Sequence, residues 1–357
     1  MSKGQVVEKN IDNYSLERLN FFKLPVIRNV NQLLEILDIN SEEEKRYFYK
    51  DNRKKYLYSH VYIPKKNGES RLIEIPDAKI MSIQRAINDV ILKNFMMTKS
   101  CCGFVKGKSL VDNAQPHVQA KTLIKIDIKD FFPSIKLNQV VYQFRYFGYG
   151  MNVSRYLGYL CVNEKFSLPQ GAPTSPSLSN LVCIKMDKRI EKYCKSKSLK
   201  YTRYADDITI SSKEYLNVQD CNKIRDFVYF ILKEEGFEPN YKKYKRFVNG
   251  QRLQVTGIIV NDKINVSKKY YRELDNAIRY IRMNGLQTHL INIGYDSNID
   301  YLNHILGLTS FVSMVNKEKG KYYLKEINSL LDDGFFDIGT IEFNTELLKV
   351  DVSFEGD

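Results

Sequence analysis

The amino-acid sequence predicts an α+β fold made of two or three domains or subdomains. Apolar residues recur at spacings of three and four over 15–58 and again over 77–98, which indicates helices. Alternating runs around 60–64, 71–76 and 123–128 indicate strands. A chain of 357 residues that is 43% hydrophobic can bury a sizeable core, so intrinsic disorder and a disulfide-stapled small domain are excluded.

The charge of the chain suggests a polyanionic partner. Lys and Arg together number 55 and Asp and Glu 42, which gives a net charge of +13. The segment 331–357 carries eight acids against Lys349 alone, so the rest of the chain is more basic still. A basic body with 25 tyrosines that could stack on bases is typical of nucleic-acid binding. A solvated, lysine-rich surface is the alternative.

The cysteines and the hydropathy pattern predict a cytoplasmic protein without a membrane partner. The six cysteines form no Cys-x-x-Cys pair and no zinc-finger spacing, so we expect reduced thiols. The first 13 residues have no apolar core of a signal peptide, and no apolar run reaches about 18 residues.

Taken in order, the first informative elements are a hairpin and a strand that ends in acids. Asn67-Gly68 separates the two alternating runs and is a strong hairpin signal. In the run over 123–132, the isoleucines at 124, 126 and 128 share one face of a strand. Lys125 and Asp127 share the other face.

Further along, a Pro/Gly loop at 168–174 precedes a helix that we expect Ser175 to cap. Residues 201–210 are typical of two short strands with a tight turn at Ala205-Asp206. From Ser267 onward the spacing predicts an amphipathic helix with its apolar stripe at positions 274, 277, 278 and 281.

Asp127, Asp206 and Asp207 are an unusual group, because acids are depleted in strands and clustered carboxylates repel one another. A single such Asp would be read as a strand end. Three of them fit two-metal phosphoryl transfer, in which ions about 3.5–4 Å apart share carboxylate oxygens. Hard oxygen ligands favour Mg²⁺ or Mn²⁺ over zinc.

Three strings carry a family resemblance. Tyr-Ala-Asp-Asp at 204–207 resembles the catalytic hairpin of reverse transcriptases. The strand ending at Asp127, followed by Phe-Phe-Pro-Ser at 131–134, resembles their first catalytic segment, and Leu-Pro-Gln-Gly at 168–171 their template-and-nucleotide loop. The strings follow in the family's order within residues 15–330.

Two further strings narrow the resemblance to retron reverse transcriptases. Asn-Ala-Gln-Pro-His at 113–117 is similar to the Asn-Ala-x-x-His insertion of that family. Val-Thr-Gly at 255–257 is similar to the triplet that the family carries after the palm. Singly, the first is equally typical of a surface amide with a hydrogen-bonded histidine, and the second of a strand end.

The resemblance implies a right-hand polymerase fold with fingers, an antiparallel-sheet palm and a helical thumb. We expect an N-terminal helical region at 1–60, fingers with the retron-type insertion at 61–122, and a catalytic palm at 123–260. A helical thumb at 261–330 and an acidic tail at 331–357 follow.

The resemblance also assigns roles at the catalytic centre. It implies that Asp127 and Asp206 bind two Mg²⁺ ions, with Mn²⁺ as an alternative, and that the backbone carbonyl of Ile128 is a further ligand. Asp207 would support the site as a looser ligand. From the residues alone, a turn at Ala205-Asp206 would bring Asp206 beside the end of the Asp127 strand.

For the incoming deoxynucleotide, Arg71 and Lys66 resemble the finger cations that hold the triphosphate, with Lys65 as an alternative to Lys66. Arg71 ranks first because a guanidinium offers a two-pronged contact to phosphate. Gln170 would contact the nucleotide from its loop.

Phe132 matches the position whose ring lies under the sugar and excludes a ribose 2′-OH, whereas Phe131 is expected in the core. The run 240–243 resembles the segment that supplies a lysine to the pyrophosphate leaving group. Lys242 is named for this role, although the run and its neighbours leave the choice of lysine open.

For RNA, the resemblance implies that the thumb and the two retron strings recognise a stem-loop in a cognate non-coding RNA. The predicted RNA-binding residues are Asn113, His117, Val255, Thr256, Gly257, Lys268, Lys269 and Arg272. The last three lie on the basic side of the helix that follows Ser267 and suit phosphates, but a solvated helix face is the alternative.

The implied activity is RNA-directed DNA synthesis from dNTPs, in which the enzyme copies part of its own RNA from a 2′-OH primer into branched RNA-linked DNA (msDNA). A host RNase H would remove template, and a separate effector protein would act with the complex in anti-phage defence. Alternatives are another minimal bacterial reverse transcriptase, such as a group II intron type, and a nucleoprotein scaffold or antitoxin component. The RNA, branch nucleotide, effector, stoichiometry and role of the acidic tail are not predicted.

Overall fold

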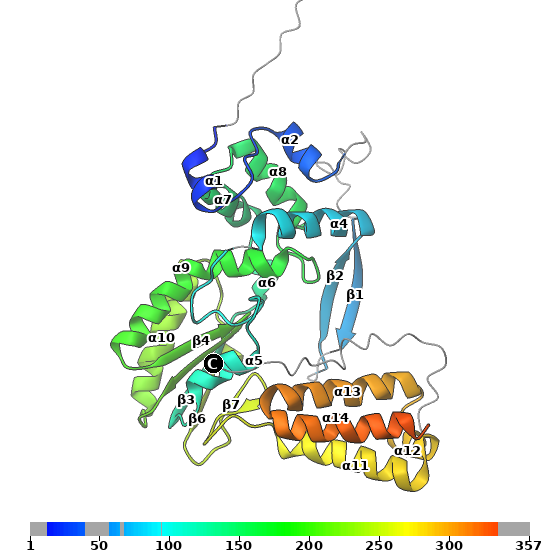
Figure 1. The fold of residues 1–357 in the computed structure, drawn as a ribbon. Helices are drawn as coiled ribbons and strands as arrows, with labels where there is room; N and C mark the ends of the chain where they lie inside the picture. The colour runs from blue at the N-terminus through cyan, green and yellow to red at the C-terminus, as the bar shows by residue number, and fades with distance from the viewer. Residues whose placement is uncertain (1–12, 40–56, 65–67, 94, 335–357) are drawn as a thin grey trace, which may run out of the picture. The chain divides into compact units, whose positions relative to one another are not determined.

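The computed structural model describes residues 13–39, 57–64, 68–93 and 95–334 (Figure 1). Lys65, Lys66, Asn67 and the segment 335–357 of the acidic tail lie outside the described residues. Their expected roles therefore stay predictions.

The chain divides into two compact units. Unit 1 comprises Met1–Thr256 and Val260–Lys263, and unit 2 comprises Gly257–Ile259 and Ile264–Asp357. The division into fingers, palm and thumb stays a prediction.

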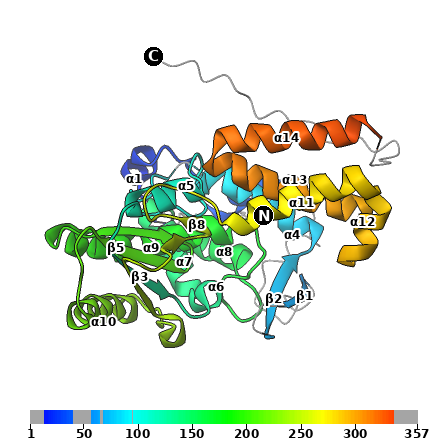
Figure 2. The same ribbon diagram turned by 90° about the horizontal axis from the view of Figure 1, so that it is seen from below.

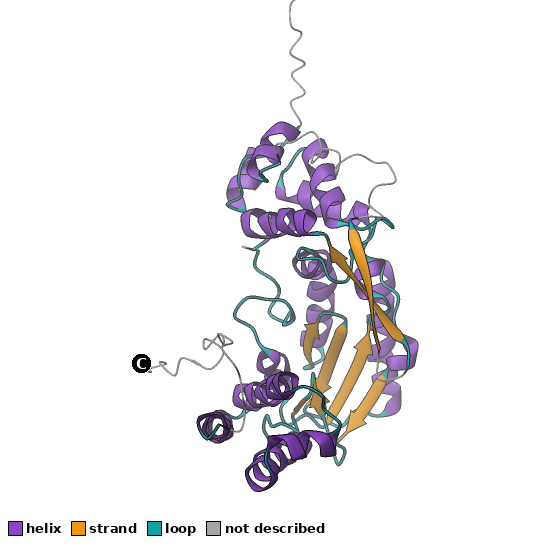
Figure 3. Ribbon diagram, turned by 90° about the vertical axis from the view of Figure 1, so that its right-hand side faces the viewer, coloured by secondary structure: helices purple, strands orange, loops and turns teal. Residues whose placement is uncertain are grey.

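Unit 1 is built on a four-stranded antiparallel sheet with the strand order β4-β5-β3-β6 (Figure 3). Its strands are β3 (Thr122–Asp127), β4 (Lys200–Tyr204), β5 (Asp207–Ser212) and β6 (Lys245–Val248). β3 pairs with both β5 and β6. The predicted strand around 123–128 and the predicted pair of strands around Ala205-Asp206 are confirmed.

The two faces of this sheet differ sharply. On one face Ile124, Ile126, Ile208 and Ile210 are buried in the main core. Helices α9 (Ser175–Ser196) and α10 (Val218–Glu234) pack on this face (Figure 1). Because side chains alternate along a strand, the other face receives the polar residues, Asp127 and Asp207 among them.

The start of α9 corrects one sequence expectation. Thr174 is the N-cap residue and Ser175 is the first helical residue, one position later than predicted. The Ser175 hydroxyl does not cap the helix, because it donates a hydrogen bond of 2.7 Å to the carbonyl of Pro169. This bond fixes the loop at 168–171 to the beginning of α9.

A helical layer forms the N-terminal side of unit 1, and its apolar residues join the same core. Asn29 caps one of its helices by accepting from the amide of Gln32, and Asp77 caps another by accepting from the amide of Ile80. The helices of this layer are α1 (Leu16–Phe21), α2 (Val30–Ile36), α4 (Ala78–Ile87), the π-helix η3 (Asn88–Leu92), α7 (Leu137–Phe147) and α8 (Met151–Cys161).

The predicted hairpin forms between β1 (Tyr58–Pro64) and β2 (Ser70–Pro76). Its last pair is Pro64 with Ser70, so the connection is longer than a two-residue turn. The short remaining elements of unit 1 are α5 (Leu110–Ala114), η4 (Gln115–His117), α6 (Phe131–Ser134), η5 (Tyr241–Lys243) and β7 (Gln254–Val255).

Unit 2 is mainly helical, and α13 and α14 lie side by side in it (Figure 2). Its elements are β8 (Ile258–Ile259), α11 (Lys268–Asn284), α12 (Leu286–Ile293), α13 (Asn298–Val315) and α14 (Lys317–Asp332). Ser267 caps α11 as predicted, and the predicted apolar stripe at 274, 277, 278 and 281 is buried. No helix among the described residues has the length and apolarity needed to cross a membrane.

Candidate active site

Asp127 is held at the end of β3 by the segment that begins at Asn240. The Asn240 amide donates to the Asp127 carbonyl at 2.8 Å, and the Asn240 side chain donates to the Asp127 carboxylate at 2.9 Å. The Lys243 ammonium lies 2.8 Å from the other carboxylate oxygen. The structure therefore places Lys243 on the aspartate, because the short helix η5 turns this lysine toward it. The role of Lys242 near the pyrophosphate stays a prediction.

The turn between β4 and β5 places Asp206 beside the end of β3. Tyr204 pairs with Asp207 across a two-residue turn, in which Ala205 has a φ of 54°. The Ile128 amide donates to the Asp206 carbonyl at 3.0 Å. Burial raises the pKa of the Asp206 carboxyl above its usual value, and the neighbouring negative charge of Asp127 raises it further.

Asp207 faces Asp127 directly in the sheet register. Its carboxylate lies 3.0 Å from the Lys125 ammonium. Burial raises the pKa of Asp207, while Lys125 acts in the opposite direction. Lys125 carries no role in the sequence prediction, although the period of two residues along β3 already places it on the face of Asp127.

The three aspartates fit a divalent cation in donor type and in charge. They offer only hard carboxylate oxygens, and burial raises the pKa of Asp206 and of Asp207, with the charge of Asp127 raising both further. Among the described residues, no group of three or more His, Cys, Asp or Glu side chains is arranged to hold a metal ion. The carboxylates of Asp127 and Asp207 are paired with lysines instead.

A buried ion pair beneath the sheet supports the Ala205-Asp206 turn. Arg203 of β4 is fully buried, and its Nε and Nη2 each lie 2.8 Å from a carboxylate oxygen of Asp187 on α9. Its Nη1 donates to the Ala205 carbonyl at 3.1 Å. Alternation along β4 puts Arg203 on the isoleucine face, where a buried cation requires a buried partner. The position of Arg203 in the alternating pattern could therefore have indicated a buried ion pair from the sequence alone.

A strand-like segment at 100–103 holds the same turn from its edge. Cys102 donates its amide to the Arg203 carbonyl at 2.8 Å. A Cβ on Gly103 would lie 2.7 Å from the Ala205 amide nitrogen, so only glycine permits this approach. The turn is thus fixed from two directions.

Three aromatic rings gather beside the turn. Phe132 is half-buried, and the centroid of its ring lies 6.1 Å from that of Phe104, which in turn lies 6.1 Å from that of Tyr204. Phe131 is buried in the core as predicted. Phe104 was not predicted. It is 45% exposed and has a φ of 58°, an uncommon conformation for a side chain of this size.

The loop at 168–171 contacts the hairpin of β1 and β2. The Gln170 carbonyl accepts from the Glu74 amide of β2 at 2.8 Å. Gly171 has a φ of 140°, and a Cβ there would lie 2.6 Å from the Glu74 carbonyl oxygen. Arg71 is exposed on β2, three residues before Glu74. Gln170 and the strand of Arg71 are therefore brought together.

Asn113, His117 and Val255 of the predicted RNA-binding set are all fully buried, and their role toward RNA stays a prediction. His117 bonds to the hydroxyls of Ser211 at 2.6 Å and Thr202 at 2.8 Å. Burial lowers the pKa of His117 to about 3, so its ring is neutral. His117 therefore links strands β4 and β5 of the sheet.

The two retron strings nevertheless meet. The Asn113 side chain donates to the Thr256 hydroxyl at 3.3 Å, although 143 residues separate them in sequence. Thr256 has a φ of 43°, which is strained for a β-branched residue. Lys268, Lys269 and Arg272 are exposed on α11 of unit 2.

Comparisons with known proteins agree with this arrangement. The family profile described as reverse transcriptase (RNA-dependent DNA polymerase) matches residues 63–303, a stretch that contains all three aspartates. The chain is similar to the Retron Ec86 reverse transcriptase of Escherichia coli, with 33% identity over 326 residues that cover 88% of this chain and 95% of that relative. The chain belongs to the retron-type reverse transcriptases.

Other similarities of this reverse transcriptase are more distant. The Retron Mx65 reverse transcriptase of Myxococcus xanthus is 28% identical over 319 residues, which cover 84% of this chain and 71% of that one. Among solved structures, telomerase from Candida albicans with a fragment of telomeric RNA has a TM-score of 0.44 at 10% identity, covering 87% of this chain and 69% of that one.

The protein is therefore an RNA-directed DNA polymerase with an α+β, right-hand polymerase fold. Enzymes of this family use divalent metal ions, an RNA template and nucleotide substrates. The retron relationship replaces the alternative of a group II intron type.

Proposed function

We propose that this reverse transcriptase copies part of a cognate non-coding RNA into single-stranded DNA that remains joined to the RNA through a 2′-OH branch. The observation that carries the proposal is the bond between Asn113 and Thr256, since it joins the two strings that resemble retron enzymes. Similarity to relatives named as retron reverse transcriptases supports it.

We assign the metal ions to Asp127 and Asp206, with the Ile128 carbonyl as a further ligand and Asp207 as a looser one. Two Mg²⁺ ions, or Mn²⁺, would stabilise the negative charge on the attacking and leaving oxygens of an in-line displacement. Lys125 and Lys243 already neutralise two of these carboxylates, and their ammonium groups would yield that position to the ions.

The nucleotide is assigned to the groups around this centre. Arg71 and Lys66 would hold the triphosphate, and Gln170 would contact the nucleotide from the loop attached to β2. Phe132 would lie under the sugar. Lys243 replaces Lys242 as the lysine near the pyrophosphate, because its ammonium already lies at the site.

The RNA is assigned to exposed positions only. Lys268, Lys269 and Arg272 would contact phosphates of a stem-loop, and Thr256 and Gly257 are partly exposed. Removal of template would fall to a host RNase H. The complex would act in anti-phage defence with a separate effector protein.

The proposal is tested by purifying the protein from cells that carry its neighbouring locus and sequencing the nucleic acid that accompanies it. The expected product is DNA whose 5′ end is released only by debranching treatment. An Asp206→Ala, Asp207→Ala variant should carry the RNA without DNA. Linear DNA with a free 5′ end in the wild type would contradict branching, although not the polymerase activity.

A further inference from the structure

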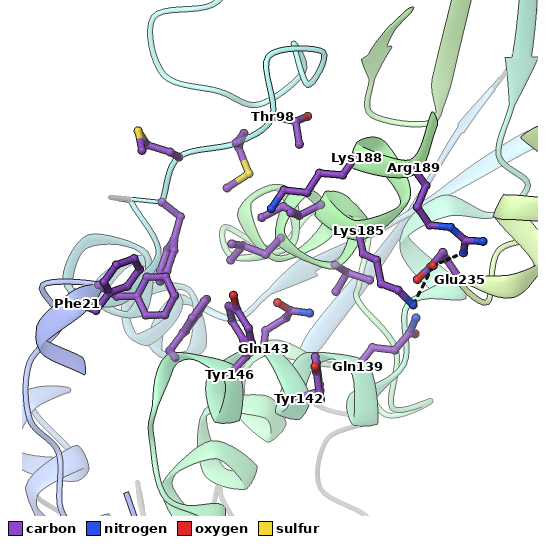
Figure 4. A pocket seen from close by; sticks show the side chains of 18 of the residues that line it. Phe21, Thr98, Gln139, Tyr142, Gln143, Tyr146, Lys185, Lys188, Arg189 and Glu235 are labelled. Atoms are coloured by element: carbon purple, nitrogen blue, oxygen red, sulfur yellow. Dashed lines mark hydrogen bonds and ion pairs between the residues drawn. The ribbon is translucent and has the colours of Figure 1, made fainter. Parts of the chain in front are cut away.

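Unit 1 contains a large groove that no part of the proposed reaction uses. It is enclosed by α1 and the residues after it, by the segment 95–98, and by α7 and α9, and its volume is about 1430 Å³ (Figure 4). Small-molecule pockets usually measure about 300–1,000 Å³, so this groove is better suited to a macromolecular segment.

The groove is separated from the aspartates by α9. One stripe of this helix, which includes Cys183, Met186, Asp187 and Ile190, is buried against the core of the sheet. Another stripe, which includes Ile184, Lys185 and Lys188, lines the groove. An occupant of the groove would therefore not meet the catalytic face.

The lining is apolar and unusually exposed. Met96 is 93% exposed, Phe21 78% and Tyr142 63%. Beneath them Phe22, Phe95 and Phe147 form a packed floor, in which the rings of Phe95 and Phe147 stack with centroids 4.0 Å apart. Clustered aromatic and methionine side chains left open in this way are typical of protein-binding surfaces.

The walls of the groove have the length and chemistry of a helix-binding site. Along α7, one wall is lined over nine residues, or about 12 Å, by Asn138, Gln139, Tyr142, Gln143 and Tyr146 (Figure 4). A wall of this length matches two to three turns of a partner helix. Amides and tyrosine hydroxyls above an aromatic floor suit the boundary between the apolar and polar faces of such a helix.

The charges at the groove favour an acidic peptide over a nucleic acid. Lys185 lies 3.1 Å from Glu235, and Arg189 is paired with both Glu235 and Glu234. Within the described part of the chain, Lys23 and Lys188 are the groove cations without an ion pair. Two available cations are too few for a strand with one phosphate per nucleotide, but they complement one or two carboxylates.

We propose that this groove binds an acidic, amphipathic helical segment of a separate protein. Two or three large apolar side chains of the segment pack on Phe22, Phe95 and Phe147, and its carboxylates lie near Lys23 and Lys188. The proposal does not depend on which RNA the enzyme copies.

The test uses the full chain and a fluorescein-labelled synthetic helix of about 14 residues, with Leu and Phe at positions i, i+3, i+4 and i+7 and Glu beside them. Fluorescence anisotropy should show saturable binding. Met96→Glu and Lys188→Glu should each weaken it at least about tenfold. Primer extension should be unchanged in both variants, because α9 lies between the groove and the aspartates.

The controls are exposed residues of the same kinds that do not line the groove, Met283→Glu on α11 and Lys223→Glu on α10. Equal binding to every variant, or equal binding of a peptide with Lys in place of Glu, would overturn the proposal. So would displacement of the probe by oligo(dT), which would assign the groove to nucleic acid.

Two other occupants would also overturn it. One is a second copy of the chain, indicated by a dimer in analytical ultracentrifugation that Met96→Glu abolishes. The other is the chain's own acidic segment, indicated if a peptide with the sequence of residues 335–357 displaces the probe at a lower concentration than the unlabelled designed helix.

Discussion

At the scale of single residues, Asp206 is placed where folding alone would not place a carboxylate. Burial and the charge of Asp127 both raise its pKa, so its ionised form is held at a cost in folding free energy. A divalent cation would offset this cost. A residue of this kind lowers the folding stability of the protein but is needed for its activity.

Asp206→Asn should therefore raise the melting temperature by about 2–4 °C in EDTA, while primer extension falls at least about 10³-fold. Added Mg²⁺ should raise the melting temperature of the wild type but not that of the variant. Asp262→Asn, an exposed control, should change neither quantity. A lower melting temperature for Asp206→Asn in EDTA would contradict this account.

Phe132→Ala should admit ribonucleotides, because it removes the ring that we assign to the underside of the sugar. We expect discrimination between dNTP and rNTP in kcat/KM to fall at least about tenfold in primer extension, or about 1.4 kcal/mol. Phe230→Ala, at an exposed position of α10, is the matched aromatic control. Unchanged discrimination in Phe132→Ala would remove the role.

His117 predicts a pH dependence of stability. Its pKa in the folded protein is about 3, below the unfolded value near 6.5, so its contribution is present above pH 6.5 and is lost as the pH falls toward 3. The wild type should lose up to about 1.4 kcal/mol per pH unit in this range relative to His117→Gln, as measured by urea denaturation. A parallel slope in His117→Gln would disprove the assignment.

The sequence alone located residues that stand out from their neighbours in the chain. It did not locate residues whose role depends on a contact with a distant segment. The aspartates could be found because acids among β-formers are conspicuous. The contact of Lys243 with Asp127 could not be predicted, since a three-residue helix gives no periodicity from which to orient its lysines. Asn113 and His117 were assigned to RNA by resemblance, and the short elements that hold them, α5 and η4, give no alternation from which their burial could be predicted.

At the scale of elements, β4 and α9 are joined by the Arg203–Asp187 pair, which also reaches the Ala205 carbonyl. Losing one partner of a buried pair leaves an uncompensated charge, whereas replacing both by apolar residues costs far less. Comparing the single with the double replacement therefore distinguishes the effect of the pair on stability from its effect on the position of the Ala205-Asp206 turn.

Asp187→Leu should lower the free energy of unfolding by about 3–5 kcal/mol, and Arg203→Met with Asp187→Leu should recover much of that loss. Primer extension should stay low in the double variant, because no guanidinium then holds the Ala205 carbonyl. Urea denaturation and single-turnover extension measure the two effects. The exposed Lys223–Asp220 pair is the control, with an expected change below about 1 kcal/mol. Full activity in the double variant would make the pair purely structural.

The strands and the hairpin were predictable because alternation of apolar and polar residues specifies both the element and its faces. The start of α9 was displaced by one residue, since the Ser175 hydroxyl bonds to Pro169 and not to its own helix. Tertiary partners of this sort leave no periodic signal. The four-stranded order β4-β5-β3-β6 likewise depends on contacts between distant segments.

At the scale of the whole molecule, the excess positive charge should determine how RNA affinity responds to salt. Reversing Lys268, Lys269 and Arg272 to Glu should weaken binding of the cognate RNA and reduce the slope of log K against log salt by about 2–3. Lys317, Lys321 and Lys325 on α14, reversed together, give the same change in net charge as a control. An equal loss in both triple variants would mean general attraction and not recognition by α11.

The path of the chain between the units determines where the protein could be divided into two parts. The backbone passes from unit 1 to unit 2 after Thr256, returns at Val260 and leaves again after Lys263. Val260 bonds to both Leu253 and Gln119 of unit 1. A protease cut or gene truncation at position 256 would strip unit 1 of a piece of its own structure, so neither half can be expected to survive such a division intact. Splitting this polymerase into exchangeable modules would require a junction after residue 263.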